Sequence, residues 1–237
     1  MLAVAKSDIG LIRQTNEDSY ECINPNLYIV ADGMGGHLAG EVASKMAVNV
    51  IKNFIYTHIN SELDLESLLK NAILEANKMI LKKAQQNKEY LGMGTTVSIV
   101  YCTDNQFFWG HVGDSRIYLL RNDELIQITK DHSLVWDLLA SGSITKSEAN
   151  VHPQRNVLTR AVGVDKNLLV DTGVCDLFKN DRLLLCTDGL TNMLNEDSIK
   201  KTISSKNIDL TESIDFLVSS AIAAGGSDNI TVILSET

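Results

Sequence analysis

Residues 28–37 read YIVADGMGGH, an apolar run that meets an aspartate and then a glycine-rich turn. Residues 183–190 repeat this pattern as LLLCTDGL, so each apolar run leads to an aspartate, Asp32 or Asp188, that is followed by glycine. A carboxylate at the end of a buried strand is costly unless a cation or a hydrogen-bond donor compensates its charge. Two such strand ends, brought together by folding, would form a site for a hard cation.

The bulk composition is that of a globular protein. The chain has 237 residues and no low-complexity segment or linker that divides it, so we expect one domain over residues 1–237. Lys and Arg number 21 and Asp and Glu number 30, which gives a formal charge of −9. A nucleic-acid binder needs a basic face, so nucleic acid is not an expected partner. The negative charge fits either carboxylates gathered around cations or plain solubility.

The four cysteines form no Cys-x-x-Cys pair, which argues against a zinc ribbon or a thioredoxin-like centre. The N-terminus lacks the apolar region of a signal peptide, and no apolar stretch approaches the roughly 20 residues that a membrane helix needs. We therefore expect a cytoplasmic protein without a membrane partner. A monomer is expected as well, because no exposed apolar heptads predict a coiled coil.

Hydrophobic periodicity predicts the main helices and strands. Apolar residues recur with helical spacing after the glycine-rich turn, over residues 65–84 and over residues 211–224. Strands are predicted over residues 27–31, 95–101, 106–112, 115–121, 182–186 and 230–234, and the two beside Gly113-Asp114 are predicted to form a tight hairpin. Runs of strands between long helices indicate the α+β class. Residues 140–163 are less periodic and more polar, which favours a mobile flap.

The glycine-rich turn also allows other interpretations. Such a turn can cradle a phosphate on its backbone N–H groups, or it can simply permit a sharp bend. No Gly-x-Gly-x-x-Gly and no Gly-Lys-Ser/Thr is present, so the dinucleotide and Walker fingerprints fail. The Cys-x5-Arg loop of cysteine phosphatases and the Gly-x-Ser-x-Gly elbow of serine hydrolases are also absent.

Further carboxylates accompany Asp32 and Asp188. Asp228 precedes the predicted strand 230–234, Asp114 occupies the predicted hairpin turn, and Asp18 follows Glu17 near the start. Any one of them alone is more often a turn former or a helix cap. Together they make an all-oxygen donor set, which selects Mg²⁺ or Mn²⁺ over zinc. Two such ions about 3.5–4 Å apart activate water and clamp a phosphoryl group.

Two further side chains are candidates for phosphoryl chemistry. Arg13 lies five residues before Asp18, and a guanidinium binds phosphate through a two-pronged fork that lysine cannot copy. A lone arginine is equally compatible with a plain surface position. His37 follows the glycines and could protonate a leaving oxygen, although a lone histidine is more often a structural hydrogen-bonding residue.

Eight motifs, taken together and in order, resemble those of the metal-dependent protein serine/threonine phosphatases, the type 2C family, in its compact bacterial branch. They cover nearly the whole chain, and they are RxxNED at residues 13–18, ADGMGGH at 31–37, GTT at 94–96, GDSR at 113–116, TKDHS at 129–133, NVLTR at 156–160, TDGL at 187–190 and SDNIT at 227–231.

The resemblance implies a four-layer α-β-β-α sandwich of two antiparallel sheets flanked by helices, forming one catalytic domain with a flap at about residues 140–163. It also implies a dinuclear Mn²⁺ or Mg²⁺ centre and a third, weaker metal site. In this chain Asp32 would bridge two metals, the Gly33 carbonyl would bind one, and Asp188 with Asp228 would hold the other. The remaining roles implied are water-mediated support from Glu17 and Asp18, a third site on Asp114 with Asp188, and phosphate orientation by Arg13.

The implied function is hydrolysis of phosphoserine and phosphothreonine in proteins, with the substrates of a serine/threonine kinase as partners. One position departs from the pattern, because eukaryotic members place their proposed acid histidine where this chain has Met34. His37 is a candidate substitute, and water at the metals is another.

Two alternative functions stay open at this point. One is a non-catalytic, metal-stabilised module that binds phosphoproteins, and the other is a phosphatase devoted to a single regulatory partner, such as an anti-sigma-factor antagonist.

Overall fold

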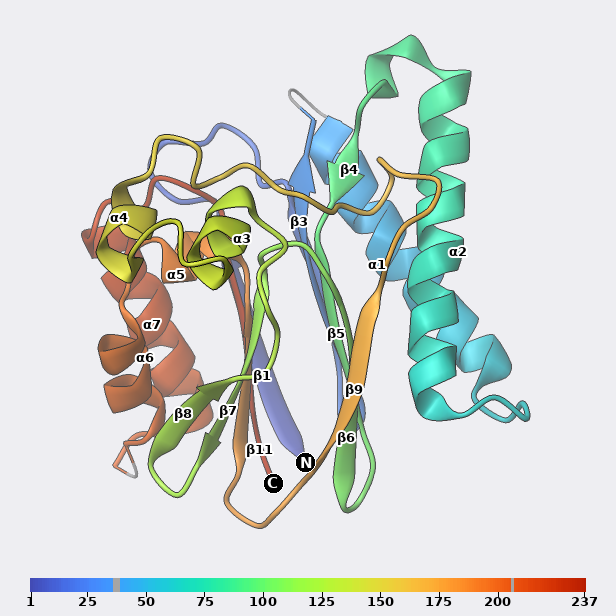
Figure 1. Cartoon of the computed structure of the whole chain (residues 1–237). Coiled ribbons are helices and arrows are strands. Elements are labelled where there is room, and N and C mark those ends of the chain that lie inside the picture. The colour runs from blue at the N-terminus through green and yellow to red at the C-terminus, as the bar shows by residue number, and fades with distance from the viewer. Residues whose placement is uncertain (36–38, 206) are drawn as a thin grey trace.

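The protein is described here by a computed structural model covering residues 1–35, 39–205 and 207–237, in which two antiparallel sheets pack face to face between helices (Figure 1). Sheet A has the spatial order β1 (Leu2–Asp8), β11 (Ile230–Glu236), β10 (Arg182–Cys186), β7 (Arg116–Arg121) and β8 (Glu124–Gln127). Sheet B has the order β2 (Asp18–Ile23), β3 (Leu27–Met34), β5 (Val97–Cys102), β6 (Gln106–Val112) and β9 (Asp171–Asp176), and the short β4 (Gly94–Thr95) pairs with β3. The predicted four-layer α+β sandwich is confirmed.

Helices cover the outer face of each sheet (Figure 1). Sheet B carries α1 (Ala39–His58) and α2 (Leu65–Gln86), and sheet A carries α5 (Asp188–Thr191), α6 (Glu196–Ile203) and α7 (Leu210–Ala223). The short helices α3 (Leu134–Ala140) and α4 (Lys146–Val151) and the 3-10 helix η1 (Lys88–Tyr90) complete the described elements. Buried side chains form three layers, one between the sheets and one under each helical layer.

The three predicted helices are present, and their buried residues explain why. In α1, Ala43, Ala47, Ile51 and Ile55 recur every four residues and are all buried. Such spacing places them on one face, which packs on sheet B. Helix α2 begins after the cap residue Asp64, whose side chain accepts a hydrogen bond from a backbone N–H in the first turn.

The predicted hairpin around Gly113 and Asp114 is wrong. Strand β6 pairs with β5 and β9 in sheet B, whereas β7 pairs with β10 and β8 in sheet A, so the chain crosses between the sheets at this turn. The backbone N–H and carbonyl of Gly113 form hydrogen bonds with His132 and not with a paired strand. The His132 N–H donates to the Gly113 carbonyl at 2.7 Å, and the Gly113 N–H donates to His132 Nδ1 at 3.1 Å.

The strand that carries Asp32 is longer than the predicted 27–31. β3 continues to Met34 because β4 pairs with its last two residues, Gly33 with Thr95 and Met34 with Gly94. Asp32 therefore lies within the strand instead of just beyond its end. The predicted strand 95–101 is in turn divided at Thr96 into β4 and β5.

The predicted flap, residues 140–163, contains α4 and is otherwise irregular. Its base is held to the body by backbone hydrogen bonds, from Leu134 N to Val157 O and from Thr159 N to His132 O, both 2.9 Å long. Movement of this segment stays a prediction. Among the described residues, no helix has both the length and the apolar character needed to cross a membrane.

Candidate metal centre

Asp18 and Asp32 are brought together by strand pairing. They lie directly opposite each other in the antiparallel register of β2 and β3. The backbone of Asp32 is held on its other side by Thr96, whose N–H donates to the Asp32 carbonyl at 2.8 Å and whose Oγ1 accepts from the Asp32 N–H at 2.9 Å. Asp18 is buried, and its Oδ2 accepts a hydrogen bond from Thr187 Oγ1 at 2.9 Å. Sheet B thus fixes two carboxylates side by side.

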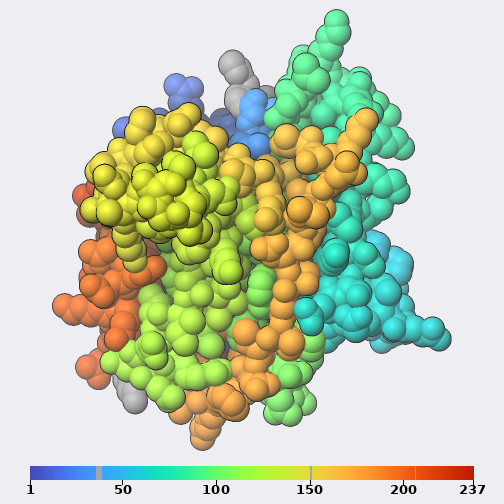
Figure 2. All heavy atoms as spheres, in the orientation of Figure 1, coloured from blue at the N-terminus to red at the C-terminus, as the bar shows by residue number. Residues whose placement is uncertain are grey.

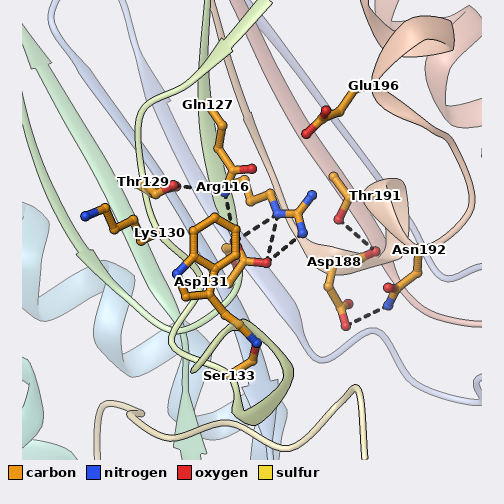
Figure 3. A network of polar contacts seen from close by, with 12 residues as sticks. Arg116, Gln127, Thr129, Lys130, Asp131, Ser133, Asp188, Thr191, Asn192 and Glu196 are labelled. Carbon is orange, nitrogen blue, oxygen red and sulfur yellow. Dashed lines mark hydrogen bonds and ion pairs between the residues drawn. The ribbon is translucent and has the colours of Figure 1, made fainter. Parts of the chain in front are cut away.

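Asp188 enters from sheet A, as the first residue of α5 after β10. One of its carboxylate oxygens, Oδ2, accepts from Asn192 Nδ2 at 3.0 Å, and Figure 3 shows the two side chains meeting at the start of this helix. The other oxygen, Oδ1, is buried and finds no hydrogen-bond donor in the described part of the chain. A buried carboxylate oxygen without a donor is costly, and a cation is the natural partner that would compensate it.

Asp228 and Arg13 form an ion pair, with 2.7 Å between Arg13 Nη2 and Asp228 Oδ2. Asn229, the next residue, fastens the loop that carries Arg13. Its Oδ1 accepts from the Glu17 N–H at 2.8 Å, and its Nδ2 donates to the carbonyls of Ile9 and Thr15 at 2.9 and 3.0 Å. The β1–β2 loop is therefore anchored to the residue beside Asp228.

Gly33 is required by close backbone approach. A Cβ at this position would lie 2.2 Å from the Gly40 carbonyl oxygen and 2.6 Å from that of Glu17, so no larger residue fits. The Gly33 N–H donates to the Glu17 carbonyl at 3.1 Å. This close contact holds the start of α1 and Glu17, the residue before Asp18, against the end of β3.

Asp114 sits in the crossing between the two sheets. Burial raises the pKa of Asp114 well above its usual range, and the charge of Asp188 raises it further. A shared metal site on Asp114 and Asp188 stays a prediction.

The pKa values of the clustered carboxyl groups are raised, because burial and mutual repulsion disfavour their charged forms. Burial raises the pKa of Asp32 well above its usual range, and the charges of Asp18 and Asp188 add to the effect. Burial likewise raises the pKa of Asp18 to about 7, and burial followed by the charge of Asp228 raises the pKa of Asp188. Like charges confined in one place cannot all ionise without a compensating cation.

The donor set fits hard divalent cations. It consists of carboxylate oxygens, the ligands that Mg²⁺ and Mn²⁺ prefer, and one buried oxygen of Asp188 has no donor in the part of the chain that the structure describes. Within residues 1–35, 39–205 and 207–237, no three His, Cys, Asp or Glu side chains close around a single point. Thr187, Asn192 and Arg13 each engage an oxygen of one of the carboxylates instead.

Some contributors were not predicted as site residues. The motifs TDGL and SDNIT contain Thr187 and Asn229, but only the aspartates of these motifs are predicted from the sequence to be site residues. Asn192 follows Asp188 by four residues, a spacing that places both on one helix face. Prediction of the short helix α5 would have revealed it. The candidate acid His37 lies outside the described residues.

Comparison with known proteins gives a consistent answer. A sequence profile described as protein phosphatase 2C matches residues 13–229. The serine/threonine phosphatase stp of Listeria welshimeri is 43% identical, over 100% of this chain and 96% of that protein. The crystal structure of the Mycobacterium tuberculosis serine/threonine phosphatase PstP/Ppp superposes with a TM-score of 0.91 at 36% identity, covering 99% of this chain and 97% of that one.

A further solved structure holds metal. The catalytic domain of the serine/threonine protein phosphatase PstP in complex with two manganese ions matches with a TM-score of 0.89 and 34% identity, over 99% of this chain and 97% of that chain. The predicted resemblance is confirmed by these similarities. The chain belongs to the protein phosphatase 2C family, the metal-dependent serine/threonine protein phosphatases.

Proposed function

We propose that this protein hydrolyses phosphoserine and phosphothreonine in other proteins, using Mn²⁺ or Mg²⁺ held by its carboxylate cluster. The observation that carries the proposal is the meeting of carboxylates from both sheets: Asp18 is paired with Asp32 in register, Thr187 beside Asp188 donates to Asp18, and one oxygen of Asp188 has no donor among the described residues. The names of the relatives and the two manganese ions of the PstP structure support it.

The proposed ligand roles are those that the resemblance implies. Asp32, central to the cluster, would be shared by two cations, with the Gly33 carbonyl on one of them and Asp188 and Asp228 on the other. Asp18 and Glu17 would assist through water, and Asp114 with Asp188 would serve a third, weaker site. When bound, the cations supply Lewis acidity, which lowers the pKa of water and neutralises charge on the phosphoryl group.

Arg13 is proposed to orient the phosphate. Its guanidinium has five N–H donors, so the contact with Asp228 leaves donors for phosphate oxygens. Its side chain is half exposed, which makes it accessible to a substrate. Because the pair with Asp228 fixes the guanidinium beside the cluster, phosphate bound by Arg13 would lie over the carboxylates.

The rest of the reaction needs a nucleophilic water and a proton for the leaving seryl or threonyl oxygen. The P–O bond to the side chain breaks, and the products are a free hydroxyl and inorganic phosphate, without a covalent enzyme intermediate. His37 is proposed as the proton donor. A His37→Gln variant that kept the full rate and pH profile would assign the proton to water instead.

The decisive assay uses an aryl phosphate with Mn²⁺, with excess chelator, and with Asp188→Ala. We expect turnover with Mn²⁺, its loss in chelator and its loss in Asp188→Ala. The matched control is Asp215→Ala, an exposed carboxylate on α7 that pairs with Lys6. Full activity in chelator would refute the proposal, and absence of any metal-dependent turnover would favour the non-catalytic binding module.

The proposed partners are phosphorylated proteins that a serine/threonine kinase modifies, and the proposed state is a monomer. Profiling of phosphopeptides would separate a broad kinase-opposing enzyme from a phosphatase devoted to one regulatory protein. Sedimentation of the purified chain tests the monomer.

A further inference from the structure

Two neighbouring aliphatic side chains are highly exposed in the loop between β1 and β2. Leu11 is 64% exposed and Ile12 is 69% exposed, and the next residue is Arg13. Single exposed aliphatic residues are ordinary on protein surfaces. Leu11 and Ile12 are consecutive and lie beside Arg13, the residue proposed to orient the phosphate. Any polypeptide that brings a phosphate to Arg13 must therefore pass close to this exposed pair.

The loop is anchored next to the carboxylate cluster. The Leu11 N–H donates to the Gly226 carbonyl at 2.7 Å, and the Gly10 N–H donates to Asp8 Oδ1 at 2.8 Å. Gly10 has φ +77°, and a Cβ there would lie 2.3 Å from the Asp228 carbonyl oxygen. The backbone before Leu11 therefore touches the backbone of Asp228. A surface that is already ordered costs little conformational entropy when a partner binds.

The charge of this loop differs from that of the cluster beside it. Residues 9–16 read IGLIRQTN and contain one arginine and no acid, whereas the cluster consists of carboxylates. In Figure 2, blue atoms of the N-terminal segment protrude at the same end of the molecule as the yellow flap segment. The loop therefore offers an apolar, mildly basic border to an acidic site.

We propose that Leu11 and Ile12 bind an aliphatic side chain of the phosphoprotein substrate, close in sequence to the phosphorylated residue. This inference rests on the proposed function and adds a substrate preference to it. An extended chain advances about 3.3 Å per residue, so the contacting residue lies within about two positions of the phosphoserine or phosphothreonine.

The test compares short phosphopeptides that carry glycine at all flanking positions with peptides that carry one leucine at −2, −1, +1 or +2. The variants are Ile12→Ser, the conservative Ile12→Leu, and Leu2→Ser as a matched control. Leu2 is 63% exposed and lies at the other end of β1 from Asp8. An aryl phosphate, which has no flanking residues, reports the chemical step alone.

We expect one leucine peptide to exceed the glycine peptide roughly tenfold in kcat/KM with the unmodified protein, through a lower KM. Ile12→Ser should abolish this preference, Ile12→Leu should keep it, and Leu2→Ser should leave it unchanged. Turnover of the aryl phosphate should be the same in all four proteins.

Equal kcat/KM for all peptides, or a leucine preference that survives Ile12→Ser, would overturn the inference while aryl phosphate turnover remained normal. A dimer in sedimentation that Ile12→Ser dissociates would assign the surface to a second copy of the chain and would also overturn it. Lack of aryl phosphate turnover in the unmodified protein with Mn²⁺ would instead refute the proposed function on which the inference rests.

Discussion

Asp18 and Asp32 face each other as a register pair of β2 and β3, so two carboxylates are fixed side by side by the main chain of sheet B. Strand pairing leaves them little freedom to separate when both are charged. The resulting repulsion is a property of the fold, and a cation can relieve it.

The metal-free protein should lose stability as the pH rises. Burial raises the pKa of Asp18 from 3.8 to about 7, so the folded state favours the protonated carboxyl. The stability that the protonated Asp18 carboxyl contributes is fully present below about pH 4 and is lost as the pH rises through about 7. Thermal unfolding in chelator between pH 4 and 8 should therefore show a steeper loss of Tm for the unmodified chain than for Asp18→Asn. Parallel curves for the two proteins would contradict this.

Thr187→Val should raise the Mn²⁺ concentration that the enzyme needs for activity. Thr187 Oγ1 donates to Asp18 Oδ2, and hydrogen-bond partners of ligating groups typically contribute about 10–100-fold in metal affinity. We expect the Mn²⁺ concentration for half-maximal activity to rise by about that factor, with kcat at saturating Mn²⁺ largely retained. Thr202→Val is the control, because its hydroxyl donates within α6, to the Ser198 carbonyl, away from the carboxylates. An unchanged activation curve for Thr187→Val would count against a role for Asp18 at the metals.

Substitution of Arg13 should reduce phosphate binding. Arg13→Ala is expected to lower kcat/KM for an aryl phosphate at least tenfold, and to weaken inhibition by inorganic phosphate in the same proportion. Arg13→Lys should restore little, because an ammonium lacks the planar fork of donors. Equal inhibition by phosphate in Arg13→Ala and in the unmodified protein would show that Arg13 serves only its pair with Asp228.

The ion pair between Arg116 and Asp131 should be important for stability. Arg116 Nη2 lies 2.6 Å from Asp131 Oδ2, and Gln127 Nε2 donates to Asp131 Oδ1 at 2.9 Å (Figure 3). Both side chains are largely buried, and removing one partner of such a pair costs about 3–5 kcal/mol. We expect Asp131→Asn to lower the free energy of unfolding in urea by about that amount. Lys6→Ala, which breaks an exposed pair, should cost at most about 1 kcal/mol.

Periodicity predicted the elements whose burial is regular, and it failed where tertiary contacts decide. Helices α1, α2 and α7 and strands β6 and β10 follow from their apolar spacing. Strand β9 was missed because its sequence, DTGVCD, mixes charge and glycine, and it is held in sheet B by pairing with β6. The hairpin at Gly113 was mispredicted because a tight turn and a crossing between sheets have the same local sequence signal, and contacts with His132 distinguish them.

The candidate site was predictable to the extent that its acidic residues stand in motifs. Asp18, Asp32, Asp114, Asp188 and Asp228 were all named from the sequence. Their mutual placement was not accessible, because Asp32 meets Asp18 through strand register and Asp188 comes from the other sheet. The supporting hydrogen bonds of Thr187, Asn192 and Asn229 depend on side-chain geometry that no spacing rule reveals.

The most direct test of the metal centre is to count the Mn²⁺ ions bound per chain by equilibrium dialysis and to assay aryl phosphate turnover on the same samples. The unmodified protein should bind at least two ions and be active. Asp32→Asn should lose both the tight binding and the turnover, whereas Asp215→Asn on the surface of α7 should retain them. An Asp32→Asn variant that binds as many ions as the unmodified protein would contradict the central role of this carboxylate.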